Sequence, residues 1–316
     1  MIIDTHCHLW GMQPKSWWDN YVEISAKLAG KSFEEIEKKV PGWADSTGDL
    51  LVEDMDEVGI DKAVLLTIDR VFEWGVTREL STEGEVICWE SIHEMYAKAT
   101  QRHPTRLLAF AGVDPRRPNA AKLLERAINE WGMKGLKMHP ASFYFYPNDP
   151  MCYKLYEKCA ELGLPVLFHT GPEDPPALGK FSLPIHLDEV ARDFPELNII
   201  MAHAGNCYWQ EAAGIAYVRP NVYLDLAWWQ PKILQNPLEQ FYRPLRSILD
   251  IAGSRRVLFA SDWPSLRQAR RMNHIPWLKT FREIPDTVRE AGIEFSDQEI
   301  NRILGENATR VLGIKD

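Results

Sequence analysis

The chain has 316 residues, of which 45% are hydrophobic and 26% charged, as is usual for a globular protein. Its formal net charge of −9 argues against a nucleic-acid-binding protein, although a local site can still attract an anionic substrate. Long apolar runs and a signal-peptide pattern are both missing, so we expect no membrane association. The five cysteines are scattered without a CxxC pair, which predicts reduced thiols and a cytoplasmic protein.

Short, nearly continuous apolar runs recur along the chain, and this pattern is typical of strands that are buried on both faces. The expected strands are Ile2–His6, Lys62–Ile68, Arg106–Val113, Gly135–His139, Pro165–His169, Asn198–His203, Val222–Leu226 and Arg256–Ser261. Helix-forming stretches such as "NAAKLLERAINEWG" and "MCYKLYEKCAELG" lie between them. Strands that alternate with helices indicate parallel βα units.

Eight such units predict an α/β fold, namely a (β/α)8 TIM-type barrel formed by a single domain over residues 1–316. A barrel of this kind usually needs about 250 residues, which leaves room for insertions. We expect one insertion at Gly11–Thr47, after the first strand, and another at Asp69–Glu85, after the second.

The first expected strand carries His6 and His8, two histidines one residue apart. Residues i and i+2 of a strand share a face, so both imidazoles should point the same way, with Asp4 beside them and Cys7 opposite. Such a pair packs poorly in a core but suits a metal ion. We expect Asp4 to hydrogen-bond near the ligands and Cys7 to lie in the core.

Other candidate ligands and acid–base groups end four further strands. They are Lys137, His139, His169, His203 and Asp262. A single histidine at a strand end is more often structural, but the carboxyl ends of barrel strands converge on one face. We therefore expect His6, His8, His169 and Asp262 to bind one metal ion. The remaining histidines, including His93 and His274, lie away from the expected strand ends and receive no catalytic role.

Imidazole and carboxylate ligands suit a divalent cation, with Zn²⁺ as the first choice and Mn²⁺, Fe²⁺ or Co²⁺ as alternatives. Such an ion lowers the pKa of a bound water towards about 7, so that hydroxide forms at neutral pH. Asp262 is the candidate to orient this water or take its proton. His203 is the candidate to polarise a carbonyl group or move a proton.

Several sequence segments resemble a known family across nearly the whole chain. They are "IIDTHCH", "MDEVGIDKAVLL", "AGVDPRRP", "GLKMHP", "FHTG", "FPELNIIMAHAGN", "FASDWP" and "GENATRVLGI". They resemble the amidohydrolase superfamily and, within it, the amidohydrolase 2 group, which includes enzymes like aminocarboxymuconate-semialdehyde decarboxylase. The resemblance implies a TIM-like barrel, a divalent metal held by His6, His8, His169 and Asp262, and a catalytic role for His203.

The resemblance leaves the reaction open. Our first expectation is that a metal-activated water hydrolyses a small amide, lactone or ester that carries a carboxylate or an aromatic ring. The alternative is non-oxidative decarboxylation of a small aromatic or unsaturated acid by a carboxy-lyase. A third interpretation, a purely structural metal site, fits less well because such sites are usually closed by four Cys or His ligands.

Lys137 departs from the pattern of the resembling decarboxylases, which generally lack a lysine on the fourth strand. In binuclear members of the superfamily a lysine there becomes a carbamate that bridges two metals. Without that modification, Lys137 would pair with an acid such as Asp262 or bind a substrate carboxylate. His139 is either a further ligand, a pocket residue or simply the strand end before Pro140.

Aromatic and cationic side chains follow the strands in the expected loops. Trp10, Arg70, Tyr208, Trp209 and Trp228 are the candidates to line a pocket for a small-molecule substrate. The aromatic residues would serve equally well to cover the barrel or to form the contact of a homodimer. Arg70 could bind a substrate carboxylate, although a solvated arginine is the more common case.

Overall fold

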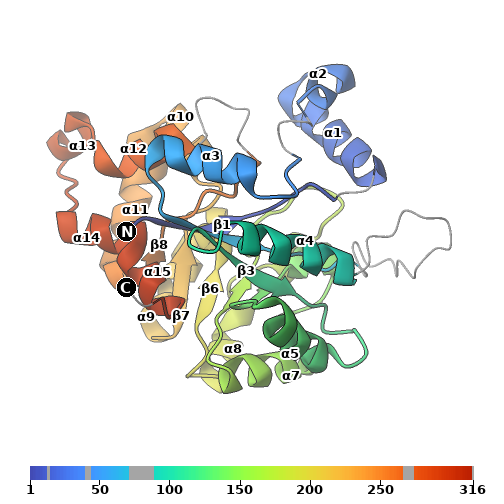
Figure 1. The fold of residues 1–316 in the computed structure, drawn as a ribbon. Coiled ribbons are helices and arrows are strands. Elements are labelled where there is room, and N and C mark those ends of the chain that lie inside the picture. Colours follow the sequence, from blue (N-terminus) through green and yellow to red (C-terminus); the bar gives the residue numbers. More distant parts are fainter. Residues whose placement is uncertain (13–14, 40–43, 71–88, 266–273, 315–316) are drawn as a thin grey trace.

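The computed structural model describes residues 1–12, 15–39, 44–70, 89–265 and 274–314. Its centre is an eight-stranded parallel sheet with the strand order β1 to β8 (Figure 1). The strands are β1 (Ile3–Cys7), β2 (Lys62–Leu66), β3 (Leu107–Gly112), β4 (Leu136–Met138), β5 (Val166–Phe168), β6 (Ile199–Met201), β7 (Val222–Asp225) and β8 (Val257–Leu258). The predicted barrel is confirmed, and each strand lies inside or within one residue of its predicted range.

Contacts between the first and last strands bring the sheet round into a nearly closed barrel. The backbone N–H of Thr5 donates to the carbonyl of Phe259 at 3.0 Å, and that of Asp262 donates to the carbonyl of His6 at 2.8 Å. Several strands are shorter than predicted because the chain leaves the sheet just before the polar residues. His203 and Asp262, for example, have positive φ angles of 59° and 60°. A positive φ is uncommon for residues other than glycine and redirects the chain.

Helices cover the outside of the barrel (Figure 1). The α-helices are α1 (Lys15–Ala29), α2 (Phe33–Glu37), α3 (Asp49–Val58), α4 (Trp89–Arg102), α5 (Ala120–Trp131), α6 (Pro140–Phe143), α7 (Pro150–Glu161), α8 (His186–Asp193), α9 (Trp209–Val218), α10 (Gln230–Gln235), α11 (Arg243–Ala252), α12 (His274–Arg282), α13 (Asp286–Glu290), α14 (Asp297–Asn301) and α15 (Asn307–Val311). Short 3-10 or π segments are η3 (Gly179–Phe181), η4 (Ala202–Tyr208), η5 (Leu238–Tyr242), η6 (Ser254–Arg256) and η7 (Arg302–Glu306).

The insertion predicted after the first strand contains helices α1 and α2, which lie together at one side of the barrel (Figure 1). They have a small apolar cluster of their own, in which Val22, Ala26 and Ile36 pack with Trp10. This cluster explains how the insertion brings Trp10 over the strand ends. Most of the insertion predicted after the second strand falls on residues 71–88, outside the described part of the chain.

Two apolar layers hold the barrel together, one inside the sheet and one between the sheet and the helices. Ile3, Val64 and Phe110 belong to the inner layer. Cys7 and Trp277 belong to the outer layer, and both are fully buried. Packed inner layers of branched and aromatic side chains are characteristic of this architecture. They provide a rigid base for the polar side chains at the strand ends.

Strand β1 contains a bulge, which changes the predicted orientation of Asp4. Between the pair Asp4–Ala63 and the pair Cys7–Leu65, β1 has two residues where β2 has one. An extra residue in one strand moves the following side chains to the other face. Asp4 therefore shares the outer face with Cys7 instead of the ligand face, so its predicted position beside the imidazoles was wrong.

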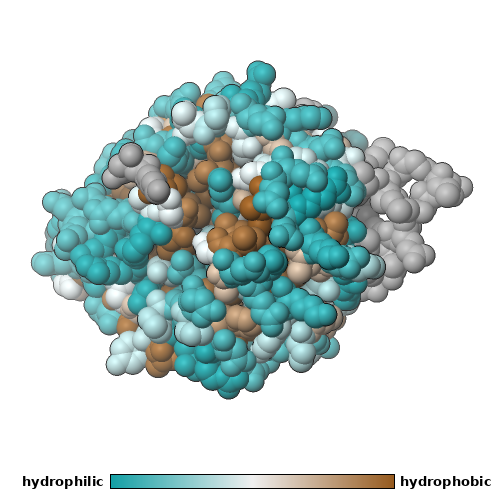
Figure 2. All heavy atoms as spheres, turned by 60° about the horizontal axis from the view of Figure 1, so that its bottom comes forward, coloured by the Kyte–Doolittle hydropathy of each residue, from teal (hydrophilic) through white to brown (hydrophobic). Residues whose placement is uncertain are grey.

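The outer surface is mainly hydrophilic, but hydrophobic residues gather near the middle of the face in Figure 2. Tyr217 and Val218 at the end of α9 are the most exposed large apolar residues in the described part of the chain. Their exposed fractions are 71% and 56%. No helix in the described part of the chain has both the length and the apolar character needed to cross a bilayer. The predicted homodimer stays a prediction.

Candidate metal centre

A cavity of about 380 Å³ lies at the carboxyl ends of the strands. Its volume is in the range of pockets for small organic ligands, roughly 300–1,000 Å³. Ten of the residues predicted from the sequence line it, namely His6, His8, Trp10, Arg70, Lys137, His139, His169, His203, Trp228 and Asp262. The fold thus brings together side chains as distant in the sequence as His6 and Asp262.

His6, His8 and Asp262 present three donor atoms at close range. The two Nε2 atoms are 3.2 Å apart, and Asp262 Oδ1 lies 3.4 Å from His6 Nε2 and 3.5 Å from His8 Nε2. Ligand atoms that share a cation at bond lengths of about 2.0–2.2 Å are separated by similar distances. The three atoms are therefore spaced like the ligands of one metal ion.

Hydrogen bonds define which nitrogen of each imidazole carries the proton. His6 Nδ1 donates to Asp225 Oδ2 at 2.9 Å, and His8 Nδ1 donates to the carbonyl oxygen of Leu66 at 2.8 Å. Burial, the largest cause, lowers the pKa of both histidines well below the usual value, so both rings are neutral. Each Nε2 then has a lone pair, and no proton lies between them. A cation would relieve this repulsion, so these residues fit a metal ion.

A similar chain of hydrogen bonds orients His169. His203 Nδ1 donates to the carbonyl of Ala227 at 3.1 Å, so His203 Nε2 accepts from His169 Nδ1, also at 3.1 Å. His169 Nε2 is then a buried lone pair, and it has no hydrogen-bond partner among the described residues. This orphaned nitrogen supports the predicted ligand role of His169, which stays a prediction.

His169 also belongs to a second group of potential ligands with His139 and Glu173. Glu173 Oε2 lies 3.3 Å from His169 Nε2 and 3.4 Å from His139 Nε2, and the two imidazoles stack with centroids 4.2 Å apart. Burial alone would raise the pKa of Glu173, but the hydrogen bond and charge of His139 lower it. The structure therefore offers a second donor group next to the first.

Lys137 and Asp262 place opposite charges in the same buried cavity. Lys137 is 3% exposed and lies in β4. Burial lowers the pKa of Lys137, and the negative charges of Asp225 and Asp262 oppose this shift. Burial also raises the pKa of Asp262, against the effect of Lys137. The predicted pairing of Lys137 with an acid and its predicted contact with a substrate both remain compatible with this position.

Asp225 is a central residue of the site that the sequence reasoning missed. Besides His6, its carboxylate accepts the backbone N–H groups of His203 at 2.8 Å and Ala227 at 3.0 Å. Trp229 Nε1 donates to the carbonyl of His203 at 2.6 Å. These bonds stabilise the positive φ of His203. A carboxylate at the end of the seventh expected strand was the signal that could have identified Asp225.

The pocket walls correct part of the aromatic prediction. Tyr208 and Trp209 are not among the residues that line the cavity. Tyr208 ends η4 and Trp209 begins α9, where the turn directs Trp209 against the outer apolar layer. Tyr21, Asn206 and Glu173 line the cavity instead. Tyr21 lies in α1, where the sequence analysis expected no helix, whereas Asn206 and Glu173 each follow a predicted strand end within four residues.

Replacing Asp225 by asparagine is expected to weaken metal binding about 10- to 100-fold, because ligand-orienting carboxylates contribute on this scale. The amide cannot satisfy the three N–H donors, since its NH₂ group would face His6 Nδ1–H or the two backbone N–H groups. The metal dissociation constant should be measured by competition with a chromogenic chelator.

Asp188→Asn is the matched control for the loss of one negative charge. Asp188 lies in α8 and pairs with Arg219 at 2.8 Å, and neither residue lines the cavity. This variant should bind metal as the wild type does. Equal weakening in both variants would show that overall charge, and not the contact with His6, controls the affinity.

Comparison with known proteins places these features in a family. The sequence model of the amidohydrolase family matches residues 3–314. A 2-amino-3-carboxymuconate-6-semialdehyde decarboxylase from Dictyostelium discoideum is 19% identical over 363 aligned positions, covering 99% of this chain and 91% of that protein. Protein fluG from Emericella nidulans is 33% identical over 105 residues, but this match covers 33% of the chain and 12% of fluG.

Solved structures share the fold. A 5-carboxyvanillate decarboxylase from Novosphingobium aromaticivorans, solved with manganese and 4-hydroxy-3-methoxy-5-nitrobenzoic acid, has a TM-score of 0.68 and 18% identity, with 99% and 96% of the two chains covered. A dihydroxybenzoic acid decarboxylase from Polaromonas sp. JS666, solved with manganese and 2-nitroresorcinol, has a TM-score of 0.67 and 18% identity, with 99% and 97% covered. At such identities the likeness establishes the fold alone.

Proposed function

We propose that this chain, which belongs to the amidohydrolase family, is a metal-dependent decarboxylase of a small aromatic or unsaturated carboxylic acid. The observation that carries the proposal is the set of unprotonated imidazole nitrogens beside Asp262 and Lys137 in one small cavity. The decarboxylases among the similar proteins favour this reaction over the hydrolysis expected first.

Metal binding is proposed to involve His6, His8, His169 and Asp262. The first two imidazoles and the carboxylate are already spaced for one ion, and His169 offers the orphaned Nε2. A divalent cation would supply a Lewis acid that attracts the oxygens of a carboxylate substrate. Zn²⁺ and Mn²⁺ are the leading choices, the first from the donor types and the second from the ions of the similar structures.

The cationic side chains in the cavity suit an anionic substrate. Lys137 and Arg70 both line it, and Trp10 and Trp228 supply flat apolar surface. Cations within hydrogen-bond distance bind carboxylates strongly in buried sites. We propose that these residues hold an acid whose ring or unsaturated chain lies against the indoles.

In the proposed reaction the bond between the carboxyl carbon and the adjacent carbon breaks. Its electron pair stays on the adjacent carbon, CO₂ leaves, and that carbon takes up one proton. Asp262 is proposed to carry this proton on the oxygen that does not face His6 and His8. His203 lines the cavity, and its Nε2 is proposed to exchange the hydrogen bond that it accepts from His169 Nδ1 for the proton of a substrate hydroxyl group.

Hydrolysis is the second candidate, and the donor group of His139, His169 and Glu173 favours it. Together with a carbamate on Lys137, that group would hold a second ion, and the single lone pair of His169 Nε2 would then serve this ion and leave His6, His8 and Asp262 for the first. Two adjacent ions usually activate water for hydrolysis. The number of bound ions therefore bears on the choice between the two reactions.

Product analysis in D₂O tests the proposal directly. Protein loaded with Mn²⁺ or Zn²⁺ should be given a panel of hydroxybenzoates and unsaturated acids, together with small lactones and amides. We expect one CO₂ per product molecule and one deuterium on the carbon that carried the carboxyl group. Incorporation of ¹⁸O from labelled water into a ring-opened or cleaved product, without CO₂, would overturn the proposal in favour of hydrolysis.

A further inference from the structure

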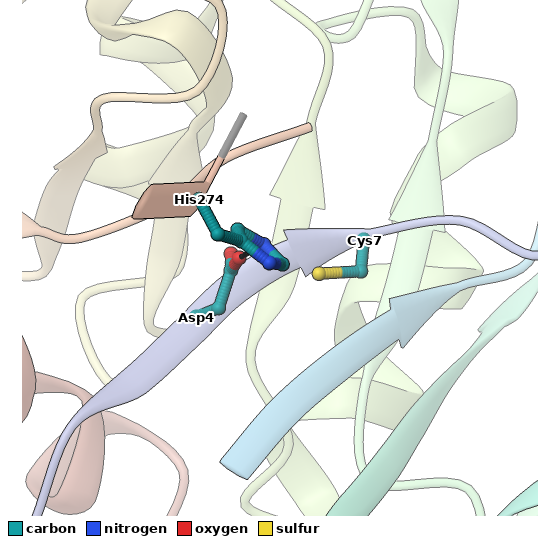
Figure 3. Close-up of side chains that lie close together, drawn as sticks. All are labelled: Asp4, Cys7 and His274. Carbon is teal, nitrogen blue, oxygen red and sulfur yellow. Dashed lines mark hydrogen bonds and ion pairs between the residues drawn. The ribbon is translucent and has the colours of Figure 1, made fainter. Parts of the chain in front are cut away.

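Asp4 lies at the centre of a buried hydrogen-bond network on the outer face of β1, and Figure 3 shows its side chain beside His274. Its Oδ1 accepts the backbone N–H groups of His6 at 3.2 Å and Ser261 at 3.0 Å. Its Oδ2 accepts the hydroxyl of Ser261 and His274 Nε2, the latter at 2.9 Å. Asp4 is fully buried and His274 is 3% exposed. The carboxylate thus binds four donors from three separate segments.

The protonation of His274 follows from its neighbours. Asp4 Oδ2 accepts, so the proton of the imidazole lies on Nε2, which is also 2.9 Å from Ser261 Oγ. His274 Nδ1 has no hydrogen-bond partner among the described residues. Cys7, also labelled in Figure 3, lies on the same side, with Sγ 3.9 Å from Ser261 Oγ. Because Asp4 and His274 already share a proton, the group forms a hydrogen-bond network rather than a second metal site.

Two of the three segments that Asp4 joins carry or adjoin a proposed metal ligand. The first is the bulge of β1, whose extra residue directs His6 into the cavity while Asp4 faces outwards. The second is Ser261, the residue before Asp262. The backbone N–H of Asp262 in turn donates to the carbonyl of His6 at 2.8 Å. The third is the start of α12, which begins with His274. The network therefore links the backbones of two ligand residues through one carboxylate.

We propose that Asp4 and His274 are positioning residues that hold the β1 bulge against the end of β8, and so keep His6 and Asp262 at ligand distance. The proposal rests on the metal centre described under Proposed function. Neither side chain lines the cavity, so Asp4 acts through the backbone N–H groups that it accepts, and His274 acts through its hydrogen bond to Asp4. A bulge is left with unpaired backbone groups, and here Asp4 satisfies the N–H of His6 within the bulge.

His274 permits a sharp comparison, because glutamine can replace one of its nitrogens. The side-chain amide nitrogen of glutamine reaches about as far as Nε2, so His274→Gln retains a donor to Asp4, whereas His274→Leu removes it. We expect His274→Leu to weaken Mn²⁺ or Zn²⁺ binding about 10- to 100-fold, the usual effect of removing a residue that orients a ligand. His274→Gln should stay within about threefold of the wild type.

His93→Leu is the matched control for the loss of a buried histidine. His93 is fully buried in α4, donates from Nδ1 to the carbonyl of Trp89 at 2.7 Å and accepts the N–H of Gly112 at Nε2. It does not line the cavity. We expect His93→Leu to lower the melting temperature while metal affinity stays unchanged. Chelator competition gives the affinity, and thermal unfolding of the metal-free protein gives the stability.

The outcomes separate this proposal from the proposed function. Wild-type protein that binds no divalent metal would refute the metal centre itself. Wild-type binding that His274→Leu leaves unchanged would refute only the positioning role, as would equal weakening in His93→Leu. If His274→Leu does not fold, Ser261→Ala removes one of the four donors to Asp4 and should weaken binding about fivefold. Unchanged affinity in that variant would also refute the proposal.

Discussion

Removing divalent metal from the purified protein is expected to abolish turnover, and adding back about one equivalent per chain should restore it. The reason is geometric, because His6 Nε2, His8 Nε2 and Asp262 Oδ1 lie 3.2–3.5 Å apart with no proton between the two nitrogens. Metal-dependent chemistry loses a Lewis acid that contributes several kcal/mol, so we expect a loss of at least about 1,000-fold.

The measurement combines elemental analysis of protein purified without chelators with assays before and after dialysis against a chelator. Near one equivalent per chain would assign the ion to the first donor group and leave Lys137 unmodified. Near two would place a second ion at His139, His169 and Glu173, and mass spectrometry of intact protein should then reveal a carbamate on Lys137. Full activity in metal-free protein would contradict the proposed mechanism.

Replacing His203 by asparagine is expected to lower kcat by about 100- to 10,000-fold, the range for losing a general acid or base. Asparagine can still donate to the carbonyl of Ala227, as Nδ1 does, while the Nε2 atom is lost. The backbone bonds of residue 203 to Asp225 and Trp229 do not depend on its side chain. We therefore expect a folded protein that retains about one metal per chain.

Measuring the metal content distinguishes a catalytic role of His203 from a purely orienting one. The distinction is needed because His203 Nε2 also accepts from His169 Nδ1, a proposed ligand residue. Turnover and metal content should be measured on the same preparation, at saturating Mn²⁺ or Zn²⁺. His186→Asn is a suitable control, because His186 begins α8 and does not line the cavity. Parallel loss of metal and turnover in His203→Asn would contradict the catalytic role and leave His203 as a residue that only orients His169.

Apolar patterning was sufficient to predict the barrel and the face that bears the site. Strands β4, β5 and β6 are only three residues long, yet their buried runs and the glycine or helix that follows them are readable in the sequence. Since parallel barrel strands all end on one face, a histidine at the end of a predicted strand is already placed near the other strand ends. The clustering of His6, His169 and His203 in one cavity agrees with this rule.

Local irregularities of the backbone were not predictable in the same way. Alternation placed Asp4 with His6 and His8, but the β1 bulge moves it to the opposite face, where His274 donates to it. A bulge depends on how a strand pairs with its neighbour, and its position is not encoded by the alternation of one strand alone. The orientation of Tyr208 was likewise not predictable from the sequence pattern, because the turn at the end of η4 leads the chain away from the cavity.

The amino-acid pattern was enough to specify the barrel and the residue types at its strand ends, because burial on both faces of a strand leaves a continuous apolar run in one segment. The tertiary structure alone decided which donors meet and which nitrogen of each histidine is protonated. Those properties depend on partners such as Asp225 for His6 and Ala227 for His203, which are distant in sequence. Hydrogen bonds across such distances arise only when the strands are packed side by side, so no single segment records them.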